Sequence, residues 1–172
     1  MTREQLKKIA PYATNANIDI YLPLLNTHMH EFNICGLNRE AAFMATLVHE
    51  SGSFKYTKEL ASGAAYEGRK DLGNTEKGDG VKFKGRGPIQ ITGRRNYTLV
   101  SEALGIDFVA NPELLEDPKH GVRASCWWWK AHGCNEIADT GDFRAVTRKV
   151  NGGYNGMTDR EKWYKIAMET LK

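Results

Sequence analysis

Two glutamates nine positions apart, Glu50 and Glu59, form the pairing in this chain that best suits catalysis. They lie on either side of a Gly-Ser step, in a segment that reads HESGSFKYTKE. Opening a glycosidic bond requires one carboxylic acid to protonate the departing oxygen and one carboxylate to act at the anomeric carbon or on a water molecule. A glutamate pair is weak evidence by itself, because most such residues are solvated surface charges.

The helix expected before Glu50 gives the two carboxyl groups unlike surroundings. Asn38 is the expected N-cap of this helix, and Phe43 and Leu47 lie on its apolar side. Glu50 follows Leu47 by three positions and is therefore expected on that same side. Apolar surroundings disfavour a charged carboxyl, which suits Glu50 to proton donation. Glu59 lies among lysines and polar residues, which suits it to the role of base.

Composition and charge favour one compact domain spanning residues 1–172. The chain is 41% hydrophobic and 26% charged, so it is long and apolar enough to bury a core. Its formal charge of +3 favours approach to anionic surfaces such as cell wall or nucleic acid, without specifying either. Cys35, Cys126 and Cys134 are odd in number and lack metal-type spacing, so reduced and mostly buried thiols are expected, without disulfides.

The chain shows no targeting or membrane segment. Residues 1–8 lack the apolar run of a signal peptide, and no later stretch approaches the roughly 18 apolar residues of a membrane span. We therefore expect no membrane insertion and a product that first accumulates in the cytoplasm of its cell.

Helical patterns dominate both ends of the chain and predict a mainly α fold. Capping boxes at Thr2/Gln5 and Thr158/Glu161 open the first and last helices, and Asp117-Pro118 opens another. Further helices are expected over residues 17–31, 39–49, 94–104 and 143–150. Residues 51–93 are rich in glycine and lose periodicity, which predicts a long functional loop with short strands around 81–83 and 88–92.

Three consecutive tryptophans, Trp127, Trp128 and Trp129, lie in the helix that Asp117 opens. Successive helical residues cannot all face one way. One or two of these rings are therefore expected in the core, with the remainder at a cleft or a partner surface.

The segment GRGPIQITGRRNY, residues 85–97, resembles glycoside hydrolase family 19, the chitinase-like enzymes, and most of all their phage endolysin branch. The resemblance spans about residue 31 to the C-terminus. It includes HESG at 49–52, AYEGR at 65–69, LGN at 72–74, GDG at 78–80, NGG at 151–153 and Asp159-Arg160. It implies a lysozyme-like, mainly α domain with a catalytic cleft and a glycine-rich irregular or short β segment.

The resemblance also implies roles for individual residues. Glu50 corresponds to the general acid, Glu59 best matches the base, and Thr92 matches a hydroxyl residue that holds the attacking water. The implied substrate-binding residues are Tyr66, Gln90, Asn96, Asn151 and Arg160. Amide side chains both donate and accept hydrogen bonds, which suits N-acetyl and hydroxyl groups.

Alternatives for three of these positions stay open at the level of sequence. Glu67 is a third nearby carboxylate that could exchange roles with Glu59. Asn151 could stabilise a turn before Gly-Gly, and Arg160 could be a surface residue within the capping box.

The activity implied is inverting acid/base hydrolysis of the β-1,4 bond between N-acetylmuramic acid and N-acetylglucosamine in peptidoglycan, for host cell lysis. No cofactor is implied. A pore-forming phage protein would release the enzyme from the host cytoplasm to the wall in the periplasm, and we expect a monomer. The alternatives are a lytic transglycosylase, a chitinase or an inactive sugar-binding module. The plant chitinase cysteine pattern is absent, which counts against chitin.

Two other chemistries are disfavoured. His28 and His30 are two residues apart on an expected helix and point in roughly opposite directions, so no metal site is expected. The basic cluster Lys82, Lys84, Arg86, Arg94 and Arg95 with Tyr97 lacks the spacing of a phosphate-binding loop or a nucleic-acid motif, so no nucleic-acid partner is expected.

Overall fold

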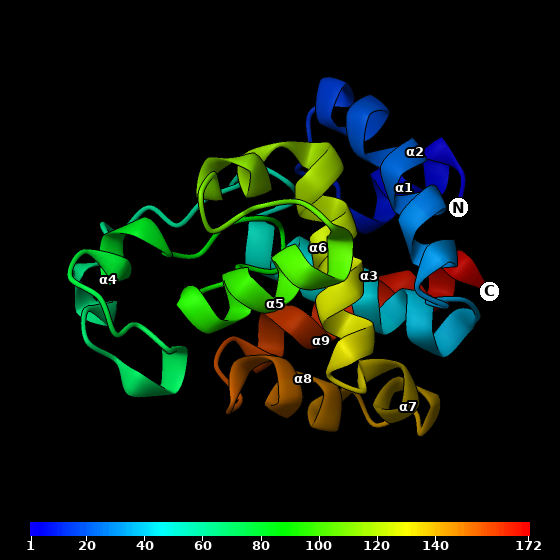
Figure 1. Ribbon diagram of the computed structural model, residues 1–172. Coiled ribbons are helices and arrows are strands. Elements are labelled where there is room, and N and C mark those ends of the chain that lie inside the picture. The colour runs from blue at the N-terminus through cyan, green and yellow to red at the C-terminus, as the bar shows by residue number, and fades with distance from the viewer.

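The computed structural model describes residues 1–172 and shows a mainly helical protein (Figure 1). Its α-helices are α1 (Arg3–Ile9), α2 (Asn15–Glu31), α3 (Leu37–Ser51), α4 (Asp79–Lys82), α5 (Arg94–Leu104), α6 (Pro118–Ala131), α7 (Cys134–Asp139), α8 (Phe143–Asn151) and α9 (Met157–Leu171). Three 3-10 helices lie in the connections, η1 (Ala64–Tyr66), η2 (Lys70–Leu72) and η3 (Pro112–Glu116). The prediction of a mainly α fold is confirmed.

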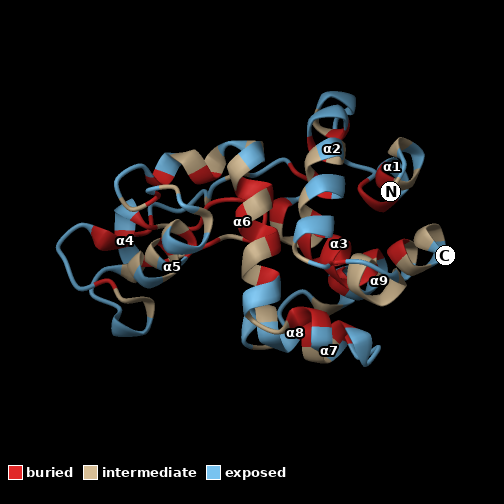
Figure 2. Cartoon of the chain, turned by 45° about the vertical axis from the view of Figure 1, so that its right-hand side comes forward, coloured by how far each residue is buried: buried red, intermediate tan, exposed pale blue.

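Helix α3 is the most buried element of the fold. Nine of its fifteen residues are buried, and its most extensive packing is against α9 at the other end of the chain. Figure 2 shows the buried residues concentrated along α3 and α6. Glu50 is the last residue but one of α3, so the core itself fixes the backbone that carries this carboxyl group.

The three consecutive tryptophans divide between core and surface as helical geometry requires. Trp129 is fully buried, meets Phe43 edge-on with 5.3 Å between ring centroids, and donates its indole N–H to Asn135 Oδ1 at 3.0 Å. Trp127 and Trp128 are half-buried against the core, and Trp128 stacks on His132. The expectation that one or two of these rings enter the core is confirmed.

Most predicted helix boundaries are confirmed. Helix α1 has the complete capping box between Thr2 and Gln5. Helix α5 ends at Gly105, whose φ of +69° lies in the left-handed region that glycine adopts readily. Helix α6 begins with Asp117 as N-cap and Pro118 at the first position. Helix α2 begins two residues earlier than predicted, because the Thr14 side chain caps it by accepting the Asn17 N–H.

Two predicted caps are wrong, because glycines begin these helices earlier. The N-cap of α3 is Gly36, with φ of +94°, and Asn38 lies inside the helix; the carboxylate of Glu40 accepts the Gly36 N–H at 3.0 Å. The N-cap of α9 is Gly156, with φ of +69°, so Thr158 is also an interior residue. A backbone turn that only glycine makes easily has replaced a side-chain cap at both sites.

The short strand predicted around Val81–Phe83 is also wrong, because this stretch belongs to α4 and its C-cap. Residues 88–92 contribute only one isolated bridge, between Ile91 and Arg86. Helix α7 has no counterpart among the predicted elements, since its six residues span less than two turns.

Polar contacts hold the irregular segment of residues 52–93 in place. Arg94, at the start of α5, donates to both oxygens of the buried Asp79 at 2.8 Å, and its backbone N–H donates to Asn74 Oδ1. The carboxylate of Glu67 accepts the backbone N–H groups of Gly78 and Gly80 at 2.8 and 2.9 Å. These side chains supply hydrogen bonds to backbone N–H groups that would otherwise bond within a sheet or helix, and they pair the buried charges with one another.

All three cysteines are free, with Cys126 and Cys134 buried and Cys35 exposed. Burial raises the pKa of the Cys134 thiol to about 12, so this thiol stays protonated and inert at neutral pH. None of the helices has the length and apolar character needed to cross a membrane.

The Asp79–Arg94 pair leads to a stability prediction for Asp79→Asn. Hydrogen bonds from Arg94 hold the pKa of Asp79 below its ordinary value. The pair's contribution is therefore complete above the unfolded-state pKa of about 3.9, and it is lost as the pH falls below that value. At neutral pH we expect the free energy of unfolding to fall by about 1.5–3 kcal/mol in urea titrations.

The matched control is Asp71→Asn, which removes an exposed carboxylate that pairs with Arg69 in the same segment. This change should leave the free energy of unfolding almost unchanged, because exposed pairs contribute little. The difference between wild type and Asp79→Asn should shrink below roughly pH 4. A difference that persists at lower pH would show that packing, and not charge, stabilises this position.

Candidate active site

Glu50 reaches the surface from the last turn of α3 and pairs with an arginine of α9. Arg160 Nη2 donates to Glu50 Oε1 at 2.5 Å. The Arg160 side chain is only 2% exposed and that of Glu50 is 21% exposed. The carboxyl group is therefore partly exposed to solvent, and a buried cation fixes its position. Hydrogen bonds between charged groups are stronger than those between neutral groups, so this pair holds the carboxyl group firmly.

Arg160 is in turn fixed by the turn that precedes α9. Its Nε donates to the carbonyl of Asn155 at 2.9 Å, and its backbone N–H donates to the carbonyl of Gly156. Its remaining nitrogen, Nη1, is buried without a hydrogen-bond partner. Arg160 is thus a buried partner of Glu50, and the alternative that it is a surface residue is wrong.

A second contact between α3 and α9 lies beside the first. His49 Nδ1 is 2.6 Å from Asp159 Oδ2, and Trp163 Nε1 donates to the same oxygen at 3.0 Å. Burial alone would raise the pKa of Asp159, but the hydrogen bonds from His49 and Trp163 outweigh it and lower that pKa. A side chain at Gly156 would collide with the His49 ring, since its Cβ would lie 2.5 Å from His49 Cε1.

The surroundings of Glu50 differ from the apolar environment that the helix pattern predicts. Phe43 and Leu47 are fully buried as expected. The carboxyl group beyond them is partly exposed and bonded to a guanidinium. The periodicity of α3 could not indicate this partner, because Arg160 lies 110 residues further along the chain.

Glu59 lies in the irregular segment and is held by uncharged donors. The Tyr66 hydroxyl donates to Oε1 at 2.8 Å, and the Gly85 N–H donates to Oε2 at 3.0 Å. The backbone N–H of Glu59 donates to the Gly85 carbonyl at 2.8 Å. Burial, together with the bond to Glu59, raises the pKa of Tyr66, so its hydroxyl stays protonated as a donor.

Gly85 brings Glu59 and Gln90 close together. A Cβ atom at this position would lie 2.6 Å from Gln90 Oε1 and 3.2 Å from Glu59 Oε2. Gln90 itself has φ of +64°, which is strained for a residue with a side chain, and its Nε2 donates to the Gly87 carbonyl at 3.0 Å. The close approach of two polar side chains therefore requires glycine at position 85.

Thr92 follows Gln90 directly and shares its local network. Its hydroxyl donates to the Gln90 carbonyl at 3.0 Å, which leaves the hydroxyl oxygen free to accept a hydrogen bond from a water. Asn96 Nδ2 donates to the Thr92 carbonyl at 2.8 Å. Thr92 and Asn96 are thus linked, and Asn96 has a structural contact in addition to any contact with substrate.

Asn151 and Glu67 have structural contacts of their own. Asn151 Oδ1 accepts the Asn155 N–H at 3.3 Å, so the turn-stabilising alternative describes this side chain. Both oxygens of Glu67 accept backbone N–H groups at the start of α4, which favours negative charge at a helix N-terminus. Glu67 is bonded only to backbone N–H groups, whereas Glu59 and Gln90 approach each other beside Gly85.

Sequence reasoning missed three features of this region. They are the His49–Asp159–Trp163 contact, the Tyr66–Glu59 hydrogen bond and the close packing at Gly85. The only signal in the sequence is that His49 and Asp159 adjoin Glu50 and Arg160.

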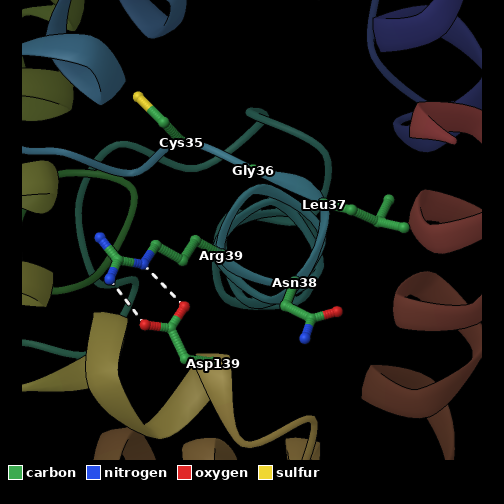
Figure 3. Close-up of a pocket in the computed structure, with 6 residues that line it drawn as sticks. All are labelled: Cys35, Gly36, Leu37, Asn38, Arg39 and Asp139. Carbon is green, nitrogen blue, oxygen red and sulfur yellow. Dashed lines mark hydrogen bonds and ion pairs between the residues drawn. The ribbon is translucent and has the colours of Figure 1, made fainter.

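The hollows of the surface lie elsewhere. Figure 3 shows one of about 340 Å³ around Cys35, where Arg39 and Asp139 form a paired hydrogen bond at 2.8 and 2.6 Å. Neither Glu50 nor Glu59 lines any of the four hollows. No group of three or more His, Cys, Asp and Glu side chains is arranged to hold a metal ion, and His28 pairs with Glu31.

Comparisons with known proteins agree with this geometry. The family model for chitinase class I, glycoside hydrolase family 19, matches residues 38–144. A glycosyl hydrolase family 19 domain-containing protein of Haemophilus influenzae is 32% identical over 163 residues, covering 77% of this chain and 80% of that protein. An endochitinase of Arabidopsis thaliana is 36% identical over 114 residues, covering 66% of this chain but only 38% of its own length.

Solved structures share the fold. A bacterial family 19 chitinase superposes with a TM-score of 0.80 at 22% identity, covering 99% of this chain and 94% of that one. Chitinase C from Streptomyces griseus superposes with a TM-score of 0.77 at 23% identity, covering 99% and 91%. The family match and the relative from Haemophilus influenzae show that the chain belongs to glycoside hydrolase family 19 and is a chitinase-like glycoside hydrolase.

Proposed function

We propose that this glycoside hydrolase is a peptidoglycan hydrolase that cleaves the β-1,4 bond between N-acetylmuramic acid and N-acetylglucosamine. The observation that carries the proposed acid/base hydrolysis is that each of two carboxyl groups is held in a fixed position by its own hydrogen bonds. Glu50 is held by a buried guanidinium on the helical body, and Glu59 is held by a hydroxyl and a backbone N–H on the irregular segment. The guanidinium favours the charged form of Glu50, so its role as acid comes from the family resemblance, whereas the uncharged donors around Glu59 suit a carboxylate that acts as base.

In this mechanism Glu50 donates its proton to the departing glycosidic oxygen. Glu59 removes a proton from the water that attacks the anomeric carbon from the opposite face, so the product is inverted. Thr92 accepts a hydrogen bond from this water, and Gln90, Asn96, Asn151 and Tyr66 contact the sugars. Inversion needs room for a water, so the two carboxyl groups should lie roughly 6.5–9.5 Å apart in the substrate complex.

The proposed biological role is that of a phage endolysin. The enzyme would act as a monomer on glycan strands in the periplasm, after a pore-forming phage protein has released it from the host cytoplasm. Support for wall glycan over chitin comes from two features of the chain. These are the absence of disulfides and a net positive charge that favours an anionic wall.

Charge-neutralising substitutions of three glutamates test the acid and base assignments. Glu50→Gln and Glu59→Gln should each lower the rate of wall lysis by roughly 100- to 10,000-fold, because each removes a proton transfer. Glu67→Gln should be much milder, because its oxygens contact only backbone. Turbidity loss of purified peptidoglycan measures the rates, and near-ultraviolet circular dichroism checks that each variant is folded.

A rate above about a tenth of wild type in Glu50→Gln would rule out its role as general acid. If Glu67→Gln is inactive and Glu59→Gln is active, the base is Glu67 and the correspondence through the glycine-rich segment is wrong.

Thr92→Val tests the positioning of the attacking water. Valine keeps the shape of the side chain but removes the hydroxyl, so kcat should fall at least about tenfold while binding to the wall persists. Release of soluble sugars gives kcat, and co-sedimentation with peptidoglycan gives binding. Unchanged turnover would mean that other groups hold the water and that Thr92 serves only its bond to Gln90.

Mass analysis of fragments from purified peptidoglycan tests the proposed reaction itself. We expect fragments that end in a free reducing N-acetylmuramic acid, because hydrolysis adds water across the bond. A freshly released product should have the inverted α configuration by proton NMR. Fragments with an internal anhydro ring would identify a lytic transglycosylase instead.

Chitin is the second candidate substrate, because several relatives are named endochitinases. Parallel digestion of chitin oligosaccharides and peptidoglycan by the same enzyme preparation separates the two. Faster hydrolysis of the chitin oligosaccharides would replace the muralytic assignment. Binding to both polymers without cleavage of either would identify an inactive sugar-binding module.

A further inference from the structure

The segment that carries Glu59 also carries the excess positive charge of the protein. Residues 55–95 contain ten Lys and Arg against five Asp and Glu, a net charge of +5. The rest of the chain contains fourteen against sixteen, a net charge of −2. Figure 1 places α4, in the middle of this segment, at the end of the molecule opposite the two chain termini. The charge of this protein is therefore strongly asymmetric.

The arginines of this segment are engaged in its structure. Arg94 bonds to Asp79 and Glu76. Arg86 is buried and donates to the Lys82 carbonyl and the Tyr97 hydroxyl. The other two bond to Asp71, Arg69 through the carboxylate and Arg95 through the backbone carbonyl. Their planar, multiply donating side chains suit these fixed contacts.

The carboxylates of the segment are engaged as well. Glu67 accepts two backbone N–H groups, and Asp71, Glu76 and Asp79 pair with arginines. Lys58 is 3.7 Å from Glu116. The other lysines of the segment, Lys55, Lys70, Lys77, Lys82 and Lys84, form no ion pair with any carboxylate. Their charges remain uncompensated by the protein.

Three of these lysines lie close in sequence to the groups that hold the two catalytic glutamates. Lys84 directly precedes Gly85, whose N–H and carbonyl both bond to Glu59. Lys82 lies two residues earlier and is exposed, and Lys55 is exposed on the stretch between Glu50 and Glu59. A polymer bound across the two glutamates would therefore pass near uncompensated positive charge.

We propose that Lys55, Lys82 and Lys84 bind the carboxylates of peptidoglycan stem peptides and make this site prefer peptide-bearing glycan over uncharged amino-sugar polymers. The inference rests on the proposed muralytic function. Peptidoglycan carries on alternate sugars short peptides with free carboxylates, whereas chitin carries no charge. Lysines on flexible side chains suit such mobile carboxylates, since an ammonium group binds as a point charge without a fixed geometry.

A nucleic acid is the other anionic polymer that a basic segment could attract. Binding of single strands normally combines positive charge with exposed aromatic rings on which bases stack. The aromatic residue of the basic cluster, Tyr97, is fully buried and bonded to Arg86 and the Lys84 carbonyl. Tyr56 is the exposed ring beside these lysines, and Lys55 Nζ lies 5.2 Å from its centroid. With Tyr97 buried, charge exceeds stacking surface here, which favours peptide carboxylates, and inhibition by an oligonucleotide tests the alternative.

The experiment compares two triple variants on two substrates. The test variant carries Lys55→Gln, Lys82→Gln and Lys84→Gln. The control variant carries Lys8→Gln, Lys130→Gln and Lys149→Gln, which remove the same charge from exposed positions on α1, α6 and α8. The substrates are soluble peptide-bearing glycan strands and the same strands after an amidase has removed their peptides and the lactyl carboxylates exposed by that cleavage have been converted to amides.

At low ionic strength the test variant should lose about tenfold in kcat/KM on peptide-bearing strands, as expected for lost electrostatic attraction. It should match wild type on the stripped strands, and the control variant should match wild type on both. The difference should vanish at about 1 M salt, where charges are screened beyond roughly 3 Å.

Four results would overturn the proposal. The first is an equal loss of kcat/KM in the test variant on both substrates, and the second is an equal loss in the control variant. The third is that wild type cleaves stripped strands as fast as peptide-bearing strands. The fourth is that an oligonucleotide inhibits wild type and the control variant but not the test variant. In the third case the muralytic function stands and only the role of the lysines falls. If wild type cleaves neither substrate, the proposed function fails as well.

Discussion

The ion pair between Arg160 and Glu50 is the contact on which the helical half of the site depends. A guanidinium that is 2% exposed is costly to bury, and it is tolerated only where a carboxylate and further acceptors surround it. Arg160 lies in the first turn of α9 and Glu50 in the last turn of α3, and these two helices form the most extensive packing in the fold. The packing of α9 against α3 therefore also fixes the position of Glu50.

The same contact organises the turn before α9. Arg160 holds the Asn155 carbonyl, and the His49 ring packs where a side chain at Gly156 would have to lie. Asn151 and Glu50 consequently belong to one unit, although 101 positions separate them in the sequence. The apolar core supplies the general stability of this unit, whereas the buried polar contacts decide which side chains meet at its surface.

Glu59 is positioned by uncharged hydrogen-bond donors and not by an ion pair. Glu59 belongs to a segment without regular strands, so its position depends on individual polar contacts from Tyr66 and Gly85. In the absence of a sheet, arginine and glutamate side chains of this segment form hydrogen bonds to nearby backbone groups and ion pairs with nearby charges. Loops held in this way can bring a backbone N–H to a side chain at short range, as Gly85 does, because glycine leaves room for two polar side chains.

The amino-acid sequence by itself determined most of the helices and the family, and it predicts two glutamates as acid and base. Local signals explain this success, since caps such as Thr2 and Asp117 act within a few residues. Local signals also explain the errors at Asn38 and Thr158, where the positive φ of a preceding glycine begins the helix earlier. Only the tertiary structure decided that Arg160 is the partner of Glu50, that Glu67 binds backbone and that, of the lysines of the basic segment, only Lys58 forms an ion pair. These contacts join residues up to 110 positions apart, and a buried charge selects its partner only when packing has excluded water from around it.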